Sequence, residues 1–185
     1  LIKALIEAAQ WMDKPENRLE VVNVISQRSY VNAPVDVVKM SMTGTFQYAP
    51  HEAPVAMPDF NVFYRYAATF PWTSHAEWFI TQMYRWGQIA APHDIKKVAA
   101  SVYRPDIYRE AAAELGIPFP TIDEKTEGNR AAAWMLAQAK SPIEMGPDRF
   151  FDGKTYDPAR LVDYINAFAV HRTAVSMEAL AKFNT

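Results

Sequence analysis

Most of this sequence divides into stretches that begin with a helix-capping residue or a proline and often stop at a glycine, a pattern typical of helices. The pattern predicts helices over residues 1–12, 13–25, 34–43, 74–86, 106–115, 130–140 and 157–183. The aromatic and β-branched stretch 60–66 is the best strand candidate, and Asp152-Gly153 predicts a small hairpin. We therefore expect a mostly α-helical chain with minor β structure.

The first predicted helix is amphipathic and has no start signal. Its apolar residues Ile2, Leu5, Ile6, Ala9 and Met12 fall on one face of a helix with 3.6 residues per turn. No Ser, Thr, Asp or Asn precedes this face to accept the first backbone N–H groups. We therefore expect the chain to open inside a helix and to be a piece of a longer protein.

Two helix starts show the capping-box pattern, in which a polar cap and an acidic side chain three positions later satisfy each other's backbone donors. They are Asp13 with Glu16 and Ser74 with Glu77. His75 and Glu77 also have the H-x-E form of zinc deaminases, but that chemistry needs cysteine ligands and this chain has no cysteine. We therefore interpret Glu77 as half of a capping box.

Composition excludes several classes of function. Hydrophobic residues make up 50% of the 185 residues, which is enough for a packed core. The 19 Lys and Arg against 21 Asp and Glu give a net charge of −2, which disfavours nucleic acid as a partner. Without cysteine there is no disulfide, thiolate metal site or cysteine nucleophile, and the six scattered glycines form no G-x-G phosphate loop. No apolar run approaches the roughly 18 residues that a bilayer requires.

The remaining polar residues form no recognisable catalytic or metal-binding motif. The chain has four histidines: His51, His75, His93 and His171. No two are spaced as neighbours on a helix, and neither G-x-S-x-G nor S-x-x-K occurs. The acidic pair Asp123-Glu124 lies in a stretch rich in Pro, Gly and charge, where we expect solvated carboxylates. A metal site built from distant residues stays open, but we expect no enzyme activity, no metal and no cofactor.

Aromatic residues gather around the predicted helix at 74–86. They are Trp72, Trp78, Phe79, Tyr84 and Trp86. Aromatic platforms for bases come with a basic groove, and Lys96-Lys97 is the only adjacent basic pair in the chain. We therefore favour packing in a core, with a partner-facing patch as the alternative.

Lys3 is the charged residue of most interest. It lies opposite the apolar face of the first helix, on the side of Glu7, Gln10 and Lys14. One interpretation is a solvated face with a weak pair between Lys3 and Glu7. The other is an ammonium group at the edge of a cleft that acts as the counter-ion of a small anion, since it offers three donors and a compact charge.

Several long strings of residues resemble the nitrate/nitrite-binding proteins of bacterial ABC transporters. The strings are residues 3–18, 70–89, 103–112 and 150–158, in the same order as in that family. The resemblance covers most of residues 1–160, whereas the sequence from about Asn166 departs from it. The family includes bicarbonate-binding proteins and a binding-protein-like regulatory domain fused to a transporter ATPase subunit.

The resemblance implies an α/β fold of the periplasmic-binding-protein type II kind, whose two lobes close on a small anion. This chain would be the C-terminal portion: residues 1–115 as part of the solute-binding fold, 116–129 as a connector, and 130–185 as a helical segment with a small hairpin. The implied partners are nitrate or nitrite and the permease and ATPase subunits of the transporter. The implied location is the periplasm, or a lipoprotein anchor at the outer face of the inner membrane.

The resemblance also implies that Lys3 is the charge partner of the anion. Members of the family carry a basic residue on the helix that corresponds to residues 2–12. Bicarbonate-binding relatives replace this charge with an acidic residue and a metal ion, so Lys3 favours nitrate or nitrite. Three hypotheses follow: a solute receptor, a sensor domain of the transporter ATPase, or a helical module that has lost its anion site.

Overall fold

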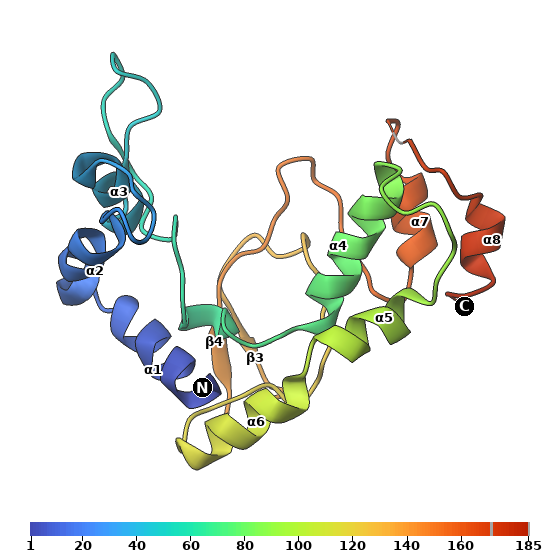
Figure 1. Cartoon of the computed structure of the whole chain (residues 1–185). Helices are drawn as coiled ribbons and strands as arrows, with labels where there is room; N and C mark the ends of the chain where they lie inside the picture. The colour runs from blue at the N-terminus through green and yellow to red at the C-terminus, as the bar shows by residue number, and fades with distance from the viewer. Residues whose placement is uncertain (171, 185) are drawn as a thin grey trace. The chain divides into compact units, whose positions relative to one another are not determined.

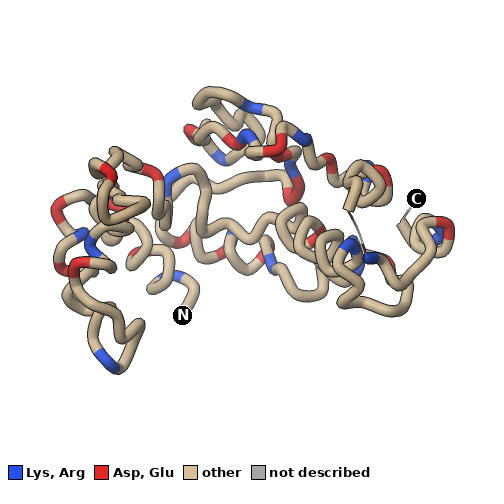
Figure 2. The backbone as a smooth tube through the Cα atoms, turned by 90° about the horizontal axis from the view of Figure 1, so that it is seen from above, with Lys and Arg blue, Asp and Glu red and all other residues tan. Residues whose placement is uncertain are grey.

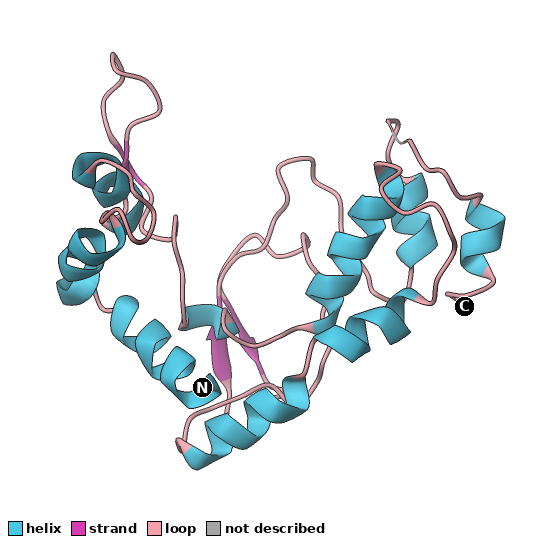
Figure 3. Cartoon of the chain, viewed as in Figure 1, coloured by secondary structure: helices cyan, strands magenta, loops and turns pink. Residues whose placement is uncertain are grey.

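The computed structural model describes residues 1–170 and 172–184, and the chain forms two compact units, Leu1–Thr69 and Phe70–Thr185 (Figure 1). These units do not coincide with the expected parts 1–115, 116–129 and 130–185, and that division of a solute-binding fold stays a prediction. His171, one of the four histidines, lies outside the described residues. Helices dominate both units and strands are short, which confirms the expectation of mostly α structure (Figure 3).

The first unit contains three α-helices, two 3-10 turns and one two-residue hairpin among its described residues. In chain order they are α1 (Ile2–Met12), η1 (Pro15–Asn17), α2 (Arg18–Ile25), α3 (Val35–Met42), β1 (Thr45–Phe46), β2 (Val55–Ala56) and η2 (Arg65–Ala67). The helices α2 and α3 pack against each other, and β1 pairs antiparallel with β2. Ile6, Ala9, Val21, Val22 and Val38 are the buried apolar side chains of α1, α2 and α3.

A single carboxylate organises the first unit. Asp13 accepts hydrogen bonds from the backbone N–H groups of Phe63 (3.0 Å), Tyr64 (2.7 Å) and Arg65 (2.7 Å). Burial alone would raise the pKa of Asp13, but these three donors and the Arg18 guanidinium lower it below its ordinary value. The carboxylate therefore stays charged and joins the end of α1 to a segment about fifty residues later.

Arg18 completes this junction. Its side chain is buried, lies 2.9 Å from Asp13 and donates to the carbonyl oxygen of Asn61 at 3.0 Å. The guanidinium also lies over the ring of Phe63, with its carbon 5.0 Å from the ring centre. These partners offset the cost of removing the Arg18 charge from water, so the junction is a stable part of the first unit.

The junction explains why two predictions for this unit were wrong. Asp13 was expected to cap the next helix with Glu16, but η1 starts at Pro15 with no side-chain cap. Residues 60–66 were expected to form a strand. The amides that a strand would pair in a ladder are instead bound by Asp13, and the chain turns into η2 with Tyr66 at a φ of 61°.

The second unit contains five α-helices and one hairpin among its described residues. In chain order they are α4 (Thr73–Arg85), α5 (Ile95–Val102), α6 (Pro105–Glu114), β3 (Trp134–Leu136), β4 (Ile143–Met145), α7 (Leu161–Asn166) and α8 (Met177–Ala181). Its core is formed by side chains from α4, α5, α7, α8 and the segments before α7 and α8: Tyr84, Ile95, Tyr156, Leu161, Tyr164, Ile165, Val175 and Leu180. The helices α5 and α7 both contact α4.

The last described residues are fastened to this core. Leu180 of α8 is fully buried. The Asn184 side chain accepts the Ile95 N–H at 2.8 Å and donates to the carbonyl oxygens of His93 and Leu180 at 2.9 and 2.8 Å. The segment up to Asn184 therefore docks on the start of α5, in the region that was expected to depart from the family.

Three predicted elements of the second unit were wrong. Residues 130–140 contain the three-residue strand β3 and no helix, because Arg130 and Asp148 exchange backbone and side-chain hydrogen bonds that close the β3–β4 hairpin. The expected helix 157–183 is reduced to α7 and α8. Asp152-Gly153 forms the expected turn, but no hairpin follows, since Tyr156 pairs with Glu127 instead of Phe150.

The helices expected at residues 1–12, 34–43 and 106–115 are confirmed as α1, α3 and α6, and the helix expected at 74–86 is confirmed as α4. The capping box at its start is wrong: α4 begins at Thr73, Trp72 supplies no side-chain cap, and Ser74 and Glu77 lie inside the helix. In the described part of the chain, no helix combines the length and the apolar composition needed to cross a membrane.

We predict that Asp13→Ala destabilises the first unit by about 3–5 kcal/mol, because it leaves buried Arg18 without its carboxylate and three amides without an acceptor. The matched control is Asp59→Ala, which removes the half-exposed ion pair with Arg65 and should cost below about 1 kcal/mol. Urea denaturation followed by circular dichroism measures both. Equal losses for the two variants would contradict the role given to Asp13.

We predict that Gly128→Ala destabilises the second unit far more than Gly116→Ala. Both glycines have a positive φ, +88° and +69°, which costs about 1–2 kcal/mol for alanine. At Gly128 the added methyl group would also overlap the carbonyl oxygen of Lys154, whereas at Gly116 it meets nothing within 4 Å. Thermal unfolding should therefore show the larger loss at Gly128, by a further 1–3 kcal/mol or so. Equal losses would mean that the loop at Lys154 adapts freely.

Candidate functional site

The first unit has a hollow beside the end of α1, which we call the α1 hollow. Its volume is about 520 Å³. The lining residues come from α1, from η1 and its preceding turn, and from the segment bound by Asp13: Glu7, Gln10, Trp11, Asp13, Lys14, Pro15, Tyr64 and Arg65. The junction between Asp13 and residues 63–65 thus forms one wall of this hollow and fixes Tyr64 and Arg65 beside it.

Some charged side chains of the α1 hollow have hydrogen-bond or ion-pair partners, and others have none among the described residues. Asp13 is saturated by backbone donors and Arg18. Arg65 forms an ion pair with Asp59 at 3.0 Å and lies 3.9 Å from Asp13. Among residues 1–170 and 172–184, no partner engages the side chains of Lys14 and Glu7. The hollow therefore offers one uncommitted ammonium group and one uncommitted carboxylate.

This arrangement suits one small, weakly charged anion better than a multiply charged one. The ammonium of Lys14 and the amide of Gln10 can donate hydrogen bonds, and the rings of Trp11 and Tyr64 offer flat apolar contacts. The carboxylates of Glu7 and Asp13 repel further negative charge on a ligand. The two acidic and two basic side chains of the lining balance in charge. The positions of the individual groups, rather than their total charge, would therefore decide what binds.

Lys3 lies on α1 with an exposed side chain. The three residues that the sequence placed on the side of Lys3, namely Glu7, Gln10 and Lys14, all line the α1 hollow, but Lys3 is not among the lining residues. The role of Lys3 as the charge partner of an anion stays a prediction.

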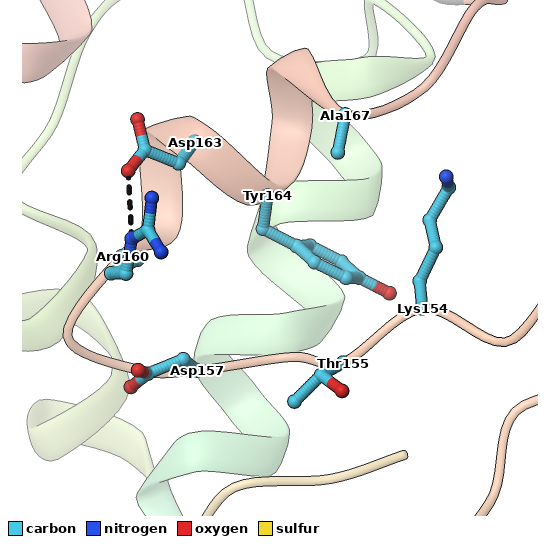
Figure 4. Close-up of a pocket in the computed structure, with 7 residues that line it drawn as sticks. All are labelled: Lys154, Thr155, Asp157, Arg160, Asp163, Tyr164 and Ala167. Carbon is cyan, nitrogen blue, oxygen red and sulfur yellow. Dashed lines mark hydrogen bonds and ion pairs between the residues drawn. The ribbon is translucent and has the colours of Figure 1, made fainter. Parts of the chain in front are cut away.

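A second pocket, of about 310 Å³, lies in the second unit around α7 (Figure 4). Arg160 and Asp163 are joined at 2.9 Å on one side of it, and the Lys154 ammonium lies 5.2 Å from the centre of the Phe168 ring. The Tyr164 hydroxyl between them accepts a hydrogen bond from Trp78 at 3.0 Å. Its two carboxylates balance its two cations, so this pocket has no charge preference for an anion.

The three described histidines, His51, His75 and His93, do not assemble into a site. His51 is exposed, and His93 shares a hydrogen bond with Tyr84 at 3.0 Å. His75 contacts the buried Glu127 carboxylate at 2.7 Å. Across residues 1–170 and 172–184, no three His, Asp or Glu side chains gather as a metal would require. Figure 2 shows Lys and Arg interspersed with Asp and Glu along both units.

Some of the aromatic residues around α4 pack in the core, and others are exposed at the surface. Trp72 and Tyr84 are buried, and Trp78 is half-buried against the core of the second unit. Phe79 and Trp86 are 56% and 46% exposed, so the expectation of core packing is wrong for these two. By helical spacing, both lie on the opposite side of α4 from the buried Tyr84. That spacing alone could have distinguished these two exposed residues from the buried ones.

Sequence reasoning missed the acidic cluster at the start of α4. Glu77 is only 1% exposed, and its Oε2 accepts a hydrogen bond from the Tyr156 hydroxyl at 3.4 Å. Burial, together with the nearby charge of Glu124, raises the pKa of Glu77 to about 7 against the pull of Lys96. The expected solvated pair is also engaged: Asp123 pairs with Arg109 and Glu124 pairs with Lys96. Glu77 stands three positions before the half-buried Ile80 and four before the buried Thr81, and this helical position was the available signal.

No model of a known protein family matches the chain. It is 28% identical over 173 residues to the nitrate/nitrite binding protein NrtA of Synechocystis sp., a match that covers 92% of this chain and 34% of the relative. It is 27% identical over 180 residues to the nitrate import ATP-binding protein NrtC of the same organism, covering 97% and 24%. It is 28% identical over 183 residues to the bicarbonate-binding protein CmpA of Synechococcus elongatus, covering 93% and 36%.

The fold also matches a solved structure. The crystal structure of the periplasmic nitrate-binding protein NrtA from Synechocystis superposes with a TM-score of 0.71 at 24% identity, over 91% of this chain and 40% of that chain. The periplasmic-binding-protein type II-like fold class is thereby confirmed. The chain spans about a third of the length of the nitrate/nitrite binding proteins that it matches. Its predicted resemblance to the nitrate/nitrite-binding proteins is confirmed over nearly its whole length.

Proposed function

We propose that this chain is part of the solute-binding component of an ABC transporter, which captures nitrate or nitrite and delivers it to the membrane permease. The single observation that carries this proposal is similarity to NrtA over more than nine-tenths of the chain, in sequence and in fold. NrtA and CmpA are solute-binding proteins, so the similarity argues for binding rather than catalysis. The proposed mechanism is closure of two lobes around the anion, followed by its transfer to the permease and the ATPase.

The proposed location is the periplasm or the outer face of the inner membrane. A receptor there would meet the anion before the permease does. The solved structure that this chain resembles is that of a periplasmic nitrate-binding protein. The anion itself would be held by local groups, since a chain with a net charge of −2 exerts no general attraction on anions.

Lys3 is the residue that we propose as the counter-ion. Nitrate is planar, weakly basic and singly charged, so one ammonium and a few neutral donors can hold it without a large desolvation cost. An exposed position on α1 leaves the Lys3 side chain accessible to a ligand. A lysine here favours nitrate or nitrite over bicarbonate, which is the alternative ligand suggested by the similarity to CmpA.

A second candidate is a binding-protein-like sensor domain attached to the transporter ATPase. The observation that favours it is the match to NrtC, which covers 97% of this chain. Such a domain would modulate transport from the cytoplasm instead of delivering cargo. A coding sequence that places a P-loop ATPase before residue 1 would support the sensor, and one with an export signal would support the receptor.

We predict that the protein encoded by the longest reading frame containing this chain binds nitrate and nitrite as single anions with a stoichiometry near one. The proposed site holds one unit charge, so sulfate should not compete. Isothermal titration calorimetry with nitrate, nitrite, bicarbonate and sulfate measures this. Heat from bicarbonate alone would overturn the nitrate proposal in favour of the CmpA-like alternative.

We predict that Lys3→Glu abolishes nitrate binding in the same protein, because it replaces an attractive charge with a repulsive one at the ligand. The loss of affinity should exceed about 30-fold, the scale of a charge-assisted contact. The matched control is Lys39→Glu, the same charge reversal at an exposed lysine of α3 that does not line the α1 hollow, which should change the affinity by less than about fivefold. Unchanged affinity in Lys3→Glu would remove Lys3 from the site, and equal losses would indicate an effect of net charge.

A further inference from the structure

The pocket around α7, which we call the α7 pocket, is lined by four charged side chains, two of which neutralise each other. Arg160 and Asp163 form an ion pair at 2.9 Å, and both side chains are exposed. The opposite charges of this pair largely cancel within the pocket. The two charges of the lining that remain are those of Lys154 and Asp157.

In the part of the chain that the structure describes, neither Lys154 nor Asp157 forms an ion pair, although both are half-buried. The Lys154 ammonium lies 5.2 Å from the centre of the Phe168 ring, which carries no net charge. Oδ1 of Asp157 accepts the N–H of Ala159 at 2.9 Å, which leaves Oδ2 for another donor. Partly buried charges without a counter-ion cost free energy, so each would be stabilised by a ligand group of opposite charge.

These two charges lie at opposite ends of the α7 pocket. Figure 4 shows Asp157 beside Arg160 at one end and the Lys154 side chain at the other, with the ring of Tyr164 between them. Lys154 and Asp157 are three positions apart, so their Cα atoms are separated by at most about 11 Å. The α7 pocket therefore has a negative end and a positive end within the reach of one small molecule.

The positive end also offers neutral hydrogen-bond donors. The Tyr164 hydroxyl accepts the indole N–H of Trp78 at 3.0 Å, a bond that leaves its own hydrogen to donate. Figure 4 shows the Tyr164 side chain pointing toward Lys154, and the hydroxyl of Thr155 lines the same pocket. An ammonium group together with two hydroxyl donors is a suitable environment for a carboxylate.

Two further charged groups stand beside the positive end without lining the pocket. Asp152 accepts the backbone N–H of Lys154 at 3.0 Å. The guanidinium carbon of Arg85 lies 3.8 Å from the centre of the Phe168 ring, the ring over which Lys154 also lies. Because these two neighbours have opposite charges, they offset each other, and Lys154 sets the sign of this end.

The middle of the α7 pocket is apolar and rigid. The Tyr164 ring packs edge-on against the rings of Tyr156 and Phe168, with centres 5.1 and 5.2 Å away, so its position is fixed. A chain of methylene groups could cover this ring, whereas a polar group there would lose its hydration. The volume of about 310 Å³ is at the lower end of the range for small-molecule sites.

We propose that the α7 pocket binds a small ω-amino acid, a molecule with a carboxylate at one end of a methylene chain and an ammonium at the other. The carboxylate pairs with Lys154, the ammonium pairs with Asp157, and the methylene chain covers the Tyr164 ring. A ligand with a single charge would leave one end of the pocket without a counter-ion. The proposal concerns the second unit alone and does not depend on the identity of any transported anion.

The experiment is a titration of the full 185-residue chain, labelled with ¹⁵N, followed by two-dimensional NMR. The probe is 6-aminohexanoate, and we expect saturable shifts of the backbone signals of residues 154–167 with a Kd of about 1 mM or tighter. Hexanoate and hexylamine each lack one charge, and the charges of glycine are too close together to reach both ends. Each of these three should bind about tenfold more weakly, because one charge-assisted contact is lost.

Two conservative variants test the two ends of the pocket separately. Asp157→Asn keeps an oxygen for the N–H of Ala159, and 6-aminohexanoate should then bind no better than hexanoate. Lys154→Met keeps an unbranched side chain over Phe168, and 6-aminohexanoate should then bind no better than hexylamine. A damaged fold would weaken all the probes alike, so this loss of preference isolates the pairing of charges.

The matched controls are Asp36→Asn on α3 and Lys97→Met on α5, both at exposed positions outside the α7 pocket. They should leave the Kd for 6-aminohexanoate within about twofold of its original value. The proposal is overturned if the wild-type chain binds hexanoate as tightly as 6-aminohexanoate, or if the shifts fall outside residues 154–167. It is also overturned if either variant folds and keeps the original preference among the probes.

Discussion

A charged carboxylate that is saturated by backbone amides is the interaction on which the first unit depends. Asp13 ends α1, binds three consecutive N–H groups at residues 63–65 and holds the buried guanidinium of Arg18. Backbone groups that no strand or helix pairs must find other partners, and here one side chain serves three of them. The walls of the α1 hollow follow from that bond set, because Tyr64 lies outside the helices and strands and Arg65 only begins the short η2.

In the second unit, other side chains bind backbone groups of irregular segments in the same way. Arg130 and Asp148 close the β3–β4 hairpin, Asn184 fastens the last described turn to α5, and Thr73 and Ser74 anchor the 123–127 segment. Long irregular stretches in both units are thus ordered by individual side-chain hydrogen bonds and ion pairs rather than by the ladders of a β-sheet. Such contacts respond to charge and protonation more directly than apolar packing does.

Sequence patterns predicted the elements whose stability is local and missed those decided by distant partners. The helices α1, α3, α4 and α6 have clear apolar periodicity or stop at a glycine, and they form where expected. Residues 60–66 and 130–140 follow distant partners instead: Asp13 binds one segment, and Asp148 turns the other into β3. The same limit applied to Glu77, whose H-x-E and capping patterns gave no sign that it would be buried beside the Tyr156 hydroxyl.

The sequence placed part of the lining of the α1 hollow on one side of a helix, but it did not give the complete set of lining residues. Glu7, Gln10 and Lys14 follow from helical spacing, whereas Tyr64 and Arg65 arrive only through the Asp13 junction. Asp13 is saturated by its donors and Arg65 is paired with Asp59, so Lys14 is the ammonium group of the hollow that has no partner among the described residues. A weakly basic anion with one charge is the species for which such a balance is sufficient, because its desolvation cost is small enough for one ammonium and neutral donors to offset.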